Sequence, residues 1–215
     1  MFDGVDILVS NIKSAIKAIS GAIVVFSSIA IAHGSTIDFE AGLAGSPIGG
    51  FYSGLGATFA NASFQYNFGL AGSSGSQGLG DITDPVAPPY NPSPSSPIVI
   101  TFSMPISFFS IVAMDVGADG ARIDAYDSTI GGLLVDYDQL IGTGGGTDNF
   151  TTLGVSAPGI FRIEIYQPLN VLGIDDGMLF DQVTFAPVPE PAAVALFSLG
   201  VAAFGIRRHS KSKSH

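Results

Sequence analysis

The side chains available for acid–base chemistry in the central part of this chain are mainly carboxylates. Residues 33–186 contain fifteen Asp and Glu residues, no Cys and no Lys, and their single histidine is His33 at the very start. Two carboxylates about 5–9.5 Å apart could hydrolyse a glycosidic bond, but no histidine would assist them. Thiol nucleophiles, cysteine zinc sites and disulfides are excluded. Most of the acids stand at expected strand ends and turns, where solvated Asp is common, so the sequence predicts a protein that is not an enzyme.

The charge of the chain is distributed unevenly. The net charge is −10 over 215 residues, but residues 33–186 set only Arg122 and Arg162 against their fifteen acids, which gives −13. Residues 1–32 are neutral and residues 187–215 carry +3. An acidic central segment repels the phosphates of nucleic acids, so we expect no nucleic-acid partner.

Hydrophobic side chains in the central segment recur every second residue, which is the period of a β-strand. In residues 62–68 the aromatic side chains at positions 64, 66 and 68 alternate with polar ones, and in residues 160–166 apolar side chains alternate with Arg162 and Glu164. Residues 179–185 are apolar at nearly every position, as in a strand covered on both faces. Further strands are expected at residues 36–39, 98–102, 106–116, 121–126, 133–137 and 150–155. Glycine-rich turns and the lack of a long helical pattern predict an all-β, antiparallel sandwich or barrel of about nine strands.

One hairpin can be predicted residue by residue. With residues 117–120 as the turn, Val116 lies opposite Ala121 and Asp115 lies opposite Arg122. The apolar side chains then face inward, and a shift of one residue would reverse that sorting. The expected inward-facing residues are Val112, Met114, Val116, Ala121, Ile123 and Ala125, and the outward-facing ones are Asp115, Arg122, Asp124 and Tyr126.

Residues 69–97 interrupt the alternating pattern. They hold six of the thirteen prolines together with many Gly and Ser residues. A connection of this length is either a flexible insertion or a functional lid, and we expect the flexible insertion. Tyr90 within it is a candidate for contacting a ligand. Elsewhere Tyr126, Tyr137 and Tyr166 are candidates for exposed aromatics, and we expect each of them to be structural.

Two short segments, residues 37–40 (IDFE) and 180–185 (FDQVTF), resemble the first and last strands of jelly-roll carbohydrate-binding modules. The resemblance implies a jelly-roll sandwich whose adjacent terminal strands share a structural calcium ion. Glu40 and Asp181 would then meet near backbone carbonyls, and hard oxygen ligands suit Ca²⁺. Gln182 stands where such modules often have a second Asp. The alternative is that both acids are ordinary solvated strand ends.

The first 32 residues have the features of a secretory signal peptide. Lys13 and Lys17 precede the apolar run of residues 18–32, which closes with small residues at Ala30 and Ala32. A positive flank, a short apolar run and an A-x-A end predict cleavage after Ala32. The 15-residue run is shorter than the roughly 20 residues of a membrane-spanning helix. An uncleaved N-terminal anchor is the alternative.

The C-terminal residues combine three features in a fixed order. Pro189-Glu190-Pro191 is followed by the apolar run 192–206 and then by Arg207 and Arg208. Basic residues after a transmembrane helix hold that end in the cytoplasm, and the prolines keep the preceding chain extended. This arrangement resembles the PEP-CTERM sorting tail of exported bacterial proteins, which is also known as the ice-binding-protein C-terminal domain. A plain C-terminal anchor is the alternative.

The PEP-CTERM resemblance implies a protease partner and a destination. In that family an exosortase-type membrane protease recognises the Pro-Glu-Pro motif and cleaves near it, and the product goes to the cell surface or to extracellular polymer. Signal peptidase and the export machinery would act first, so the C-terminal helix would hold the exported domain only transiently. Ice binding is not expected, because the central segment has no regular Thr-x-Thr ladder.

Together these features predict a non-enzymatic exported protein of the cell surface or extracellular matrix. An extracellular polysaccharide-binding module is the first alternative, although the chain has no Trp to stack on sugar rings. A secreted glycan hydrolase is the second alternative, and a close carboxylate pair in a cleft would distinguish it.

Overall fold

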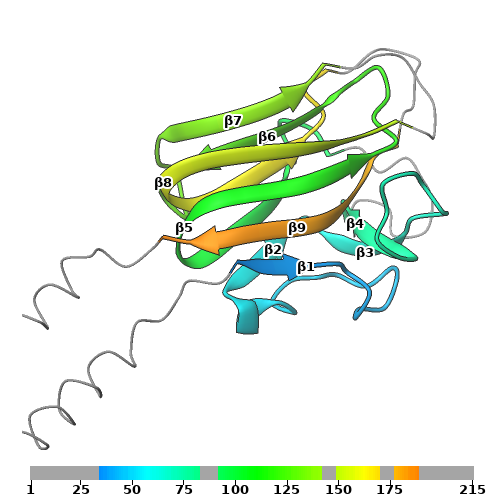
Figure 1. The fold of residues 1–215 in the computed structure, drawn as a ribbon, viewed down its shortest axis with the longest axis horizontal. Helices are drawn as coiled ribbons and strands as arrows, with labels where there is room; N and C mark the ends of the chain where they lie inside the picture. Colours follow the sequence, from blue (N-terminus) through cyan, green and yellow to red (C-terminus); the bar gives the residue numbers. More distant parts are fainter. Residues whose placement is uncertain (1–33, 83–91, 142–148, 170–176, 189–215) are drawn as a thin grey trace, which may run out of the picture. The chain divides into compact units, whose positions relative to one another are not determined.

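The computed structural model describes residues 34–82, 92–141, 149–169 and 177–188, and His33–Val188 form one compact unit. Its strands pair only in the antiparallel sense, which confirms the expected all-β antiparallel class (Figure 1). The elements are β1 Ser35–Ile37, η1 Ser53–Leu55 (a single 3-10 turn), β2 Ala57–Ala60, β3 Ser63–Tyr66, β4 Gln77–Gly80, β5 Ile98–Met114, β6 Ala121–Tyr126, β7 Leu134–Leu140, β8 Phe150–Tyr166 and β9 Leu179–Pro187.

Two layers share the long strands β5 and β8. In one layer the first part of β5 lies between β2 and the last part of β8, and β6 and β7 continue from the other edge of β8. In the other layer the last part of β5 lies between the first part of β8 and β9, and β1 and β4 pair with the far edge of β9. β3 completes this layer beside β4. The result is a β-sandwich in which two strands pass from one sheet into the other.

The long strands change sheets at proline and glycine residues. The register between β5 and β8 shifts between Thr101 and Phe108, a stretch that contains Pro105. On β8 the same level holds Pro158 and Gly159, whose φ is +84°. Proline has no N–H for the ladder and glycine tolerates positive φ, so the backbone can turn here without leaving the sandwich. Each of these strands was therefore predicted as two.

The core between the layers is built mainly from aromatic and β-branched side chains. Phe39 makes edge-on ring contacts with Tyr52, Phe59 and Phe64 at centroid distances of 5.8, 6.0 and 6.5 Å. The largest fully buried side chains are those of Phe39, Phe64, Phe102, Phe109, Phe180, Ile37, Leu79, Ile98, Ile100, Ile111, Met114 and Ile123.

The predicted hairpin around residues 117–120 is wrong in its pairing. The expected inward-facing side chains are all buried, but Val112 and Met114 belong to a separate cluster, and Asp124, which was expected to face outward, is also buried. β5 pairs with β2, β8 and β9, whereas β6 pairs with β7 and β8. Alternation identifies the buried face of a strand but not its neighbour. Arg122 consequently forms its ion pair with Asp124 of its own strand and not with Asp115.

The prediction that residues 69–97 form one irregular loop is also wrong. Strand β4 lies inside this segment and pairs with β3 on one side and with β9 on the other. Strand β2 is a second strand that the sequence analysis missed. Tyr90 lies outside the described residues.

No helix in the described part of the chain is long and apolar enough to cross a membrane. The expected signal and C-terminal helices, residues 18–32 and 192–206, lie outside the described residues.

Candidate functional site

The predicted acid pair begins with a sharp backbone turn after β1. Phe39 has a φ of +61° and places its ring in the core, while the neighbouring side chains point the other way. Asp38 is exposed and accepts a 3.2 Å hydrogen bond from the Glu40 N–H. Glu40 is thereby directed at the segment between β3 and β4.

Asp181 is positioned by a β-bulge in β9. The register between β5 and β9 shifts between Ser110 and Val112, and Gln182 opposite this shift has a φ of +51°. A bulge of this kind re-aims side chains. The Asp181 carboxylate is completely buried and faces the same segment between β3 and β4 that Glu40 contacts.

Residues 72–77, which we call the clamped loop, satisfy both carboxylates. Asp181 Oδ2 accepts from the Ser74 N–H (2.5 Å) and hydroxyl (2.8 Å), and its Oδ1 accepts from the Gln182 N–H (2.7 Å). Glu40 Oε1 accepts from the Gln77 N–H (2.7 Å), and its Oε2 accepts from the Ser76 hydroxyl (3.0 Å). The two acids therefore hold one loop against both terminal strands.

The electrostatics of this site follow from burial among acids. Burial raises the pKa of Asp181 above its ordinary value, against the lowering effect of the hydrogen bonds from Ser74 and Gln182, and Glu40 adds a further upward push. The Tyr52 hydroxyl is buried with no hydrogen-bond partner among the described residues. Burial and the charges of Asp38, Asp181 and Glu40 raise the pKa of Tyr52 to about 12.

The backbone carbonyls beside the acids receive glutamine amides. Gln77 Nε2 donates to the carbonyls of Glu40 (3.3 Å) and Gly42 (3.2 Å), and Gln182 Nε2 donates to the carbonyl of Gly72 (2.9 Å). Gln77 Oε1 is buried without a partner in the described part of the chain. Oxygens of the type that a hard cation prefers therefore lie near one another, and each of them accepts a hydrogen bond from the protein. Among the described residues no group of three or more His, Cys, Asp or Glu side chains could hold a metal ion.

Calcium at Glu40 and Asp181 stays a prediction, and calorimetric titration of the purified chain decides it. A calcium site predicts saturable heat with Ca²⁺ that Asp181→Ala abolishes, because a hard cation needs the carboxylate. Asp138→Ala, which alters a carboxylate on another strand, is the matched control and should leave binding intact. No heat at millimolar Ca²⁺, or binding that survives Asp181→Ala, would leave the two acids as hydrogen-bond anchors only.

A second cluster, which the sequence analysis did not assemble, covers the outward face of β6, β7 and β8. The register places Arg122 opposite Tyr166, Asp124 opposite Glu164 and Tyr126 opposite Arg162, and β7 adds Tyr137 opposite Asp124 and Gln139 opposite Arg122. Because alternate side chains of a strand share a face, all of these lie together. We call this set the Arg–Tyr face: Arg122, Asp124, Tyr126, Tyr137, Gln139, Arg162, Glu164 and Tyr166.

Each arginine of the Arg–Tyr face is held between an acid and an aromatic ring. Arg122 Nε lies 2.8 Å from Asp124 Oδ1, and its guanidinium carbon lies 4.3 Å from the ring centroid of Tyr137. The second arginine repeats the arrangement, with Nε 3.0 Å from Glu164 Oε1 and the guanidinium 4.1 Å from the Tyr126 ring. Both are cation–π contacts, in which a guanidinium lies over the face of a tyrosine ring.

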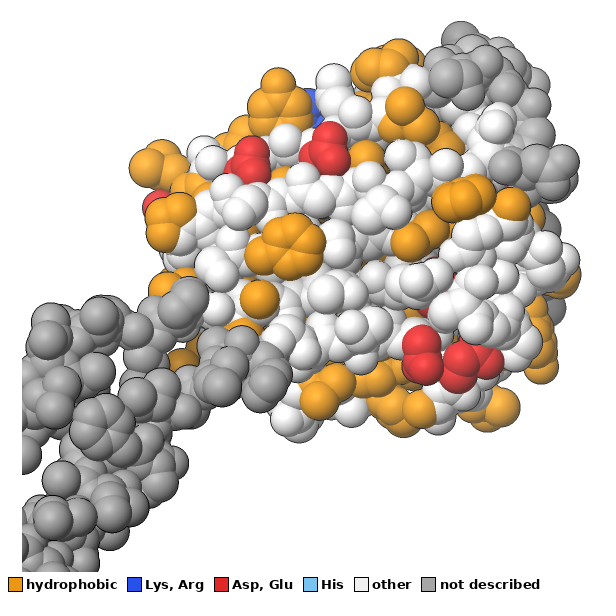
Figure 2. Space-filling model, in the orientation of Figure 1, with side chains coloured by type: hydrophobic (Ala, Val, Ile, Leu, Met, Phe, Trp, Pro, Cys, Tyr) orange, Lys and Arg blue, Asp and Glu red, His pale blue; other side chains and the backbone are white. Residues whose placement is uncertain are grey.

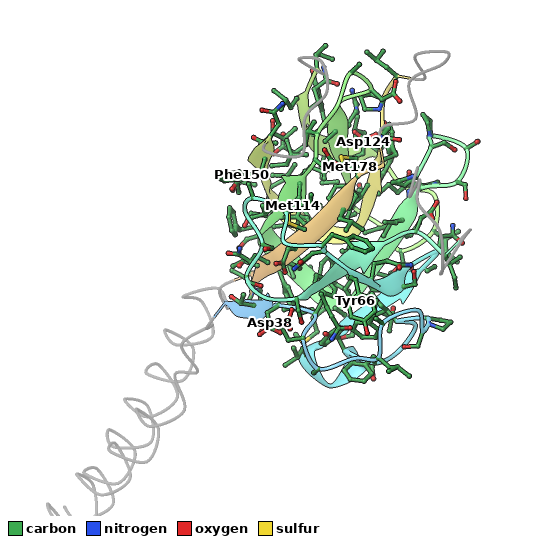
Figure 3. The ribbon with its side chains drawn as sticks, turned by 90° about the vertical axis from the view of Figure 1, so that its right-hand side faces the viewer. Asp38, Tyr66, Met114, Asp124, Phe150 and Met178 are labelled. Atoms are coloured by element: carbon green, nitrogen blue, oxygen red, sulfur yellow. The ribbon has the colours of Figure 1, made fainter. Side chains whose placement is uncertain are left out.

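The Arg–Tyr face presents paired charges and rigid rings. Burial and a 2.8 Å hydrogen bond to Asp124 Oδ2 raise the pKa of Tyr166 to about 12. Tyr137 is 52 % exposed, so part of its ring is accessible. The two candidate sites lie apart, with Asp124 labelled near the top and Asp38 near the bottom of Figure 3. Outward alternation of Arg162 and Glu164 was visible in the sequence, but the cross-strand partners were not.

Two further acids bind the backbone of a neighbouring strand. Asp138 Oδ2 accepts from the Gly154 N–H (2.8 Å), and Asp136 Oδ2 accepts from the Ser156 N–H (2.7 Å). β7 thereby closes the edge of β8 with carboxylates, which blocks edge-to-edge pairing with another chain. These acids are structural.

The predicted signal cleavage residues Ala30 and Ala32 and the predicted sorting residues Pro189, Glu190, Pro191, Arg207 and Arg208 lie outside the described residues. The expected tail is nevertheless confirmed, because the family model of the PEP-CTERM protein-sorting motif matches residues 187–208. That range contains all five predicted sorting residues. The motif indicates an exported protein.

No curated protein matches the chain with significance. Among solved structures, the K2 cleaved adhesin domain of Lys-gingipain is 12 % identical, with a TM-score of 0.43 over 71 % of this chain and 97 % of that one. A β-1,3-glucan-binding CBM6 from Bacillus halodurans is 14 % identical, with a TM-score of 0.39 over 70 % and 94 %. CsCBM6-3 from Clostridium stercorarium, solved with cellobiose, is 12 % identical, with a TM-score of 0.36 over 72 % and 94 %.

Proposed function

We propose that this chain, whose PEP-CTERM motif indicates export, is a non-enzymatic protein of the cell surface or extracellular matrix. Signal peptidase removes residues 1–32, and the apolar run 192–206 then holds the exported jelly-roll sandwich in the membrane. An exosortase-type protease cleaves near Pro189-Glu190-Pro191 and releases the domain. The match of the sorting motif to residues 187–208 carries this proposal.

The contacts of the described carboxylates support the non-enzymatic part of the proposal. Asp124 and Glu164 are cross-strand partners on one face, as a glycosidase pair would need to be. Each is in an ion pair with an arginine, and Asp124 also accepts from the Tyr166 hydroxyl. Both carboxylates are thus engaged by donors of the protein itself, and neither is free to contact a substrate.

Deleting residues 189–215 should move the protein from the surface fraction to the periplasm or the medium. The truncation spares the sandwich but removes the motif, the apolar run and the basic end. Cell fractionation with an antibody to the domain measures the shift. Lys211→Ala, which lies beyond the matched range, is the control and should fractionate like the wild type. Unchanged fractionation of the truncated chain would contradict the sorting proposal.

A second candidate function, binding of a neutral extracellular polysaccharide, is favoured by the Arg–Tyr face. Its two arginines are balanced by Asp124 and Glu164, so the face carries donors and acceptors without net charge. The exposed ring of Tyr137 and the polar groups beside it suit stacking and hydrogen bonding to hydroxyl-rich rings. The −13 charge of residues 33–186 repels anionic polymers.

Tyr137→Ala should weaken retention of the purified chain on neutral glycans by about tenfold, since aromatic contacts contribute on the order of 1–2 kcal/mol. Affinity electrophoresis through gels containing neutral polysaccharides gives the measurement. Tyr66→Ala, which removes a similarly exposed ring on β3, is the control. No retention of the wild type, or equal loss in both variants, would remove this candidate.

A further inference from the structure

We infer that the end of the sandwich from which the sorting tail leaves rests on the surface of a lipid bilayer while the tail is attached. This end consists of the bend of β5 around Pro105, the β6–β7 loop (residues 127–133) and the last residues of β9. The inference rests on the proposed function, because it requires the apolar run 192–206 to be held in the membrane.

The point where the chain leaves the sandwich is fixed to the β5 bend. The Val188 N–H donates to the Pro105 carbonyl (3.2 Å), and the Ser107 hydroxyl donates to the Pro187 carbonyl (3.3 Å). Three residues, Pro189, Glu190 and Pro191, lie between Val188 and Ala192, where the apolar run begins. The four residue-to-residue steps from Val188 to Ala192 span at most about 14 Å. A membrane-held tail therefore keeps this bend close to the bilayer surface.

Large apolar side chains are exposed at the same end. Met104 in the bend is 69 % exposed, and in the β6–β7 loop Ile130 is 88 % exposed and Leu133 is 72 % exposed. The pairing of Tyr126 with Arg162 brings this loop to the level of the bend. Figure 1 shows the loop, the bend and the end of β9 at the left of the sandwich, and Figure 2 shows hydrophobic side chains exposed at that end as well as elsewhere on this face.

Hydrogen bonds hold the β6–β7 loop in this presentation. Asp127 Oδ1 accepts from the Leu133 N–H (2.7 Å), and the Ser128 hydroxyl donates to the Ile130 carbonyl (3.1 Å). Arg162 Nη1 donates to the Ser128 carbonyl (3.4 Å). A loop whose polar groups are bonded internally can place Ile and Leu side chains in the lipid interface at low cost. The same apolar side chains could instead contact a second copy of the chain. We favour the bilayer, because a membrane-held tail keeps this end of the sandwich next to the lipid.

Site-directed fluorescence quenching of the full chain tests this orientation. The chain has no cysteine, so a single introduced cysteine gives a single labelled site. Ile130→Cys and Met104→Cys report on the proposed end. Phe150→Cys is the matched control, because Phe150 pairs with Met114 at the opposite end of the shared strands and is also exposed. Each labelled chain is reconstituted in phosphatidylcholine vesicles that contain a lipid-attached quencher.

We expect loss of fluorescence at positions 130 and 104 and little loss at position 150. Equal quenching at all three positions, or disulfide-linked dimers of the unlabelled Ile130→Cys chain without lipid quenching of the labelled one, would overturn the inference. Flotation of the same vesicles separates the two proposals. A chain that floats but fails the quenching pattern overturns the orientation alone, whereas a chain that does not float overturns the membrane-held tail as well.

Discussion

Replacing Asp181 by alanine is expected to lower the free energy of unfolding by about 2–4 kcal/mol, one of the largest effects of any single polar substitution in this domain. The change removes the carboxylate that accepts three hydrogen bonds, so the N–H groups of Ser74 and Gln182 lose their acceptor. The loss of a buried acceptor costs the desolvation of its former donors. Urea denaturation followed by circular dichroism measures the change.

Asp181→Asn is the conservative companion, since it keeps the shape and one acceptor oxygen and should cost less. Ser74→Ala removes only the hydroxyl bond and should cost about 1 kcal/mol. A loss below about 0.5 kcal/mol in Asp181→Ala would contradict the role of the clamped loop.

The difference in stability between the wild type and Asp181→Asn should depend on pH. Burial raises the pKa of Asp181 in the folded state above the ordinary 3.8. A carboxyl group whose pKa is higher in the folded than in the unfolded state binds its proton more tightly when the chain is folded. Burial of the ionised carboxylate is unfavourable for folding, and protonation removes this cost as the pH falls through the pKa of the folded state. The stability of the wild type relative to Asp181→Asn should therefore increase between neutral pH and a pH near 3.8. A difference that is constant or changes the other way would contradict the burial of an ionised carboxyl.

Phe39→Ala should cost about 3–5 kcal/mol, as for other fully buried aromatic side chains. Phe39 is completely buried, contacts three other rings, and separates Asp38 from Glu40. Its loss opens a cavity and loosens the backbone turn that directs Glu40 to the clamped loop. The thermal midpoint and urea midpoint of the variant report the loss.

Phe39→Leu keeps the positive φ and most of the volume, so it should cost clearly less than Phe39→Ala. Phe68→Ala removes an exposed ring and should stay within about 0.5 kcal/mol of the wild type. A similar loss in the Phe68 and Phe39 variants would contradict the placement of the core.

Much of the fold class was predictable because alternation reports burial directly. Val116, Ala121, Ile123 and Ala125 were correctly expected in the main core. The expected inward face of Val112 and Met114 was wrong, because these residues lie in a separate buried cluster with Leu179, on the face opposite Ile111 and Ala113. Strand neighbours were not predictable, because a strand carries no local signal for its partner. The turn at residues 117–120 suggested a hairpin, but β5 and β6 both pair with β8 instead.

The strand breaks had a different cause. Pro105, Pro158 and Gly159 normally end strands, and here they mark the points where β5 and β8 pass between sheets. Strand β4 was hidden because Gln77–Gly80 holds two glycines and lies among residues typical of loops.

The candidate site was predictable only in part. Glu40 and Asp181 were identified from their segments, and the structure brings both to the clamped loop. The Ser74, Ser76 and Gln77 donors were missed, since small polar residues in a glycine-rich segment give no pattern. The Arg–Tyr face depends on cross-strand registers that the sequence does not specify. The sorting motif was predictable, because Pro189-Glu190-Pro191, the apolar run and the basic end are contiguous, and the family model matches the same residues.

The most direct test of the central proposal is the intact mass of the mature protein recovered from cells. The protein is purified with an antibody to the domain, and its intact mass identifies the N-terminus and the C-terminus of the mature chain in one measurement. Export with sorting predicts a chain that begins at His33 and ends near Pro191, without the apolar run and the basic residues. A mature chain that still ends at His215 would contradict processing of the tail.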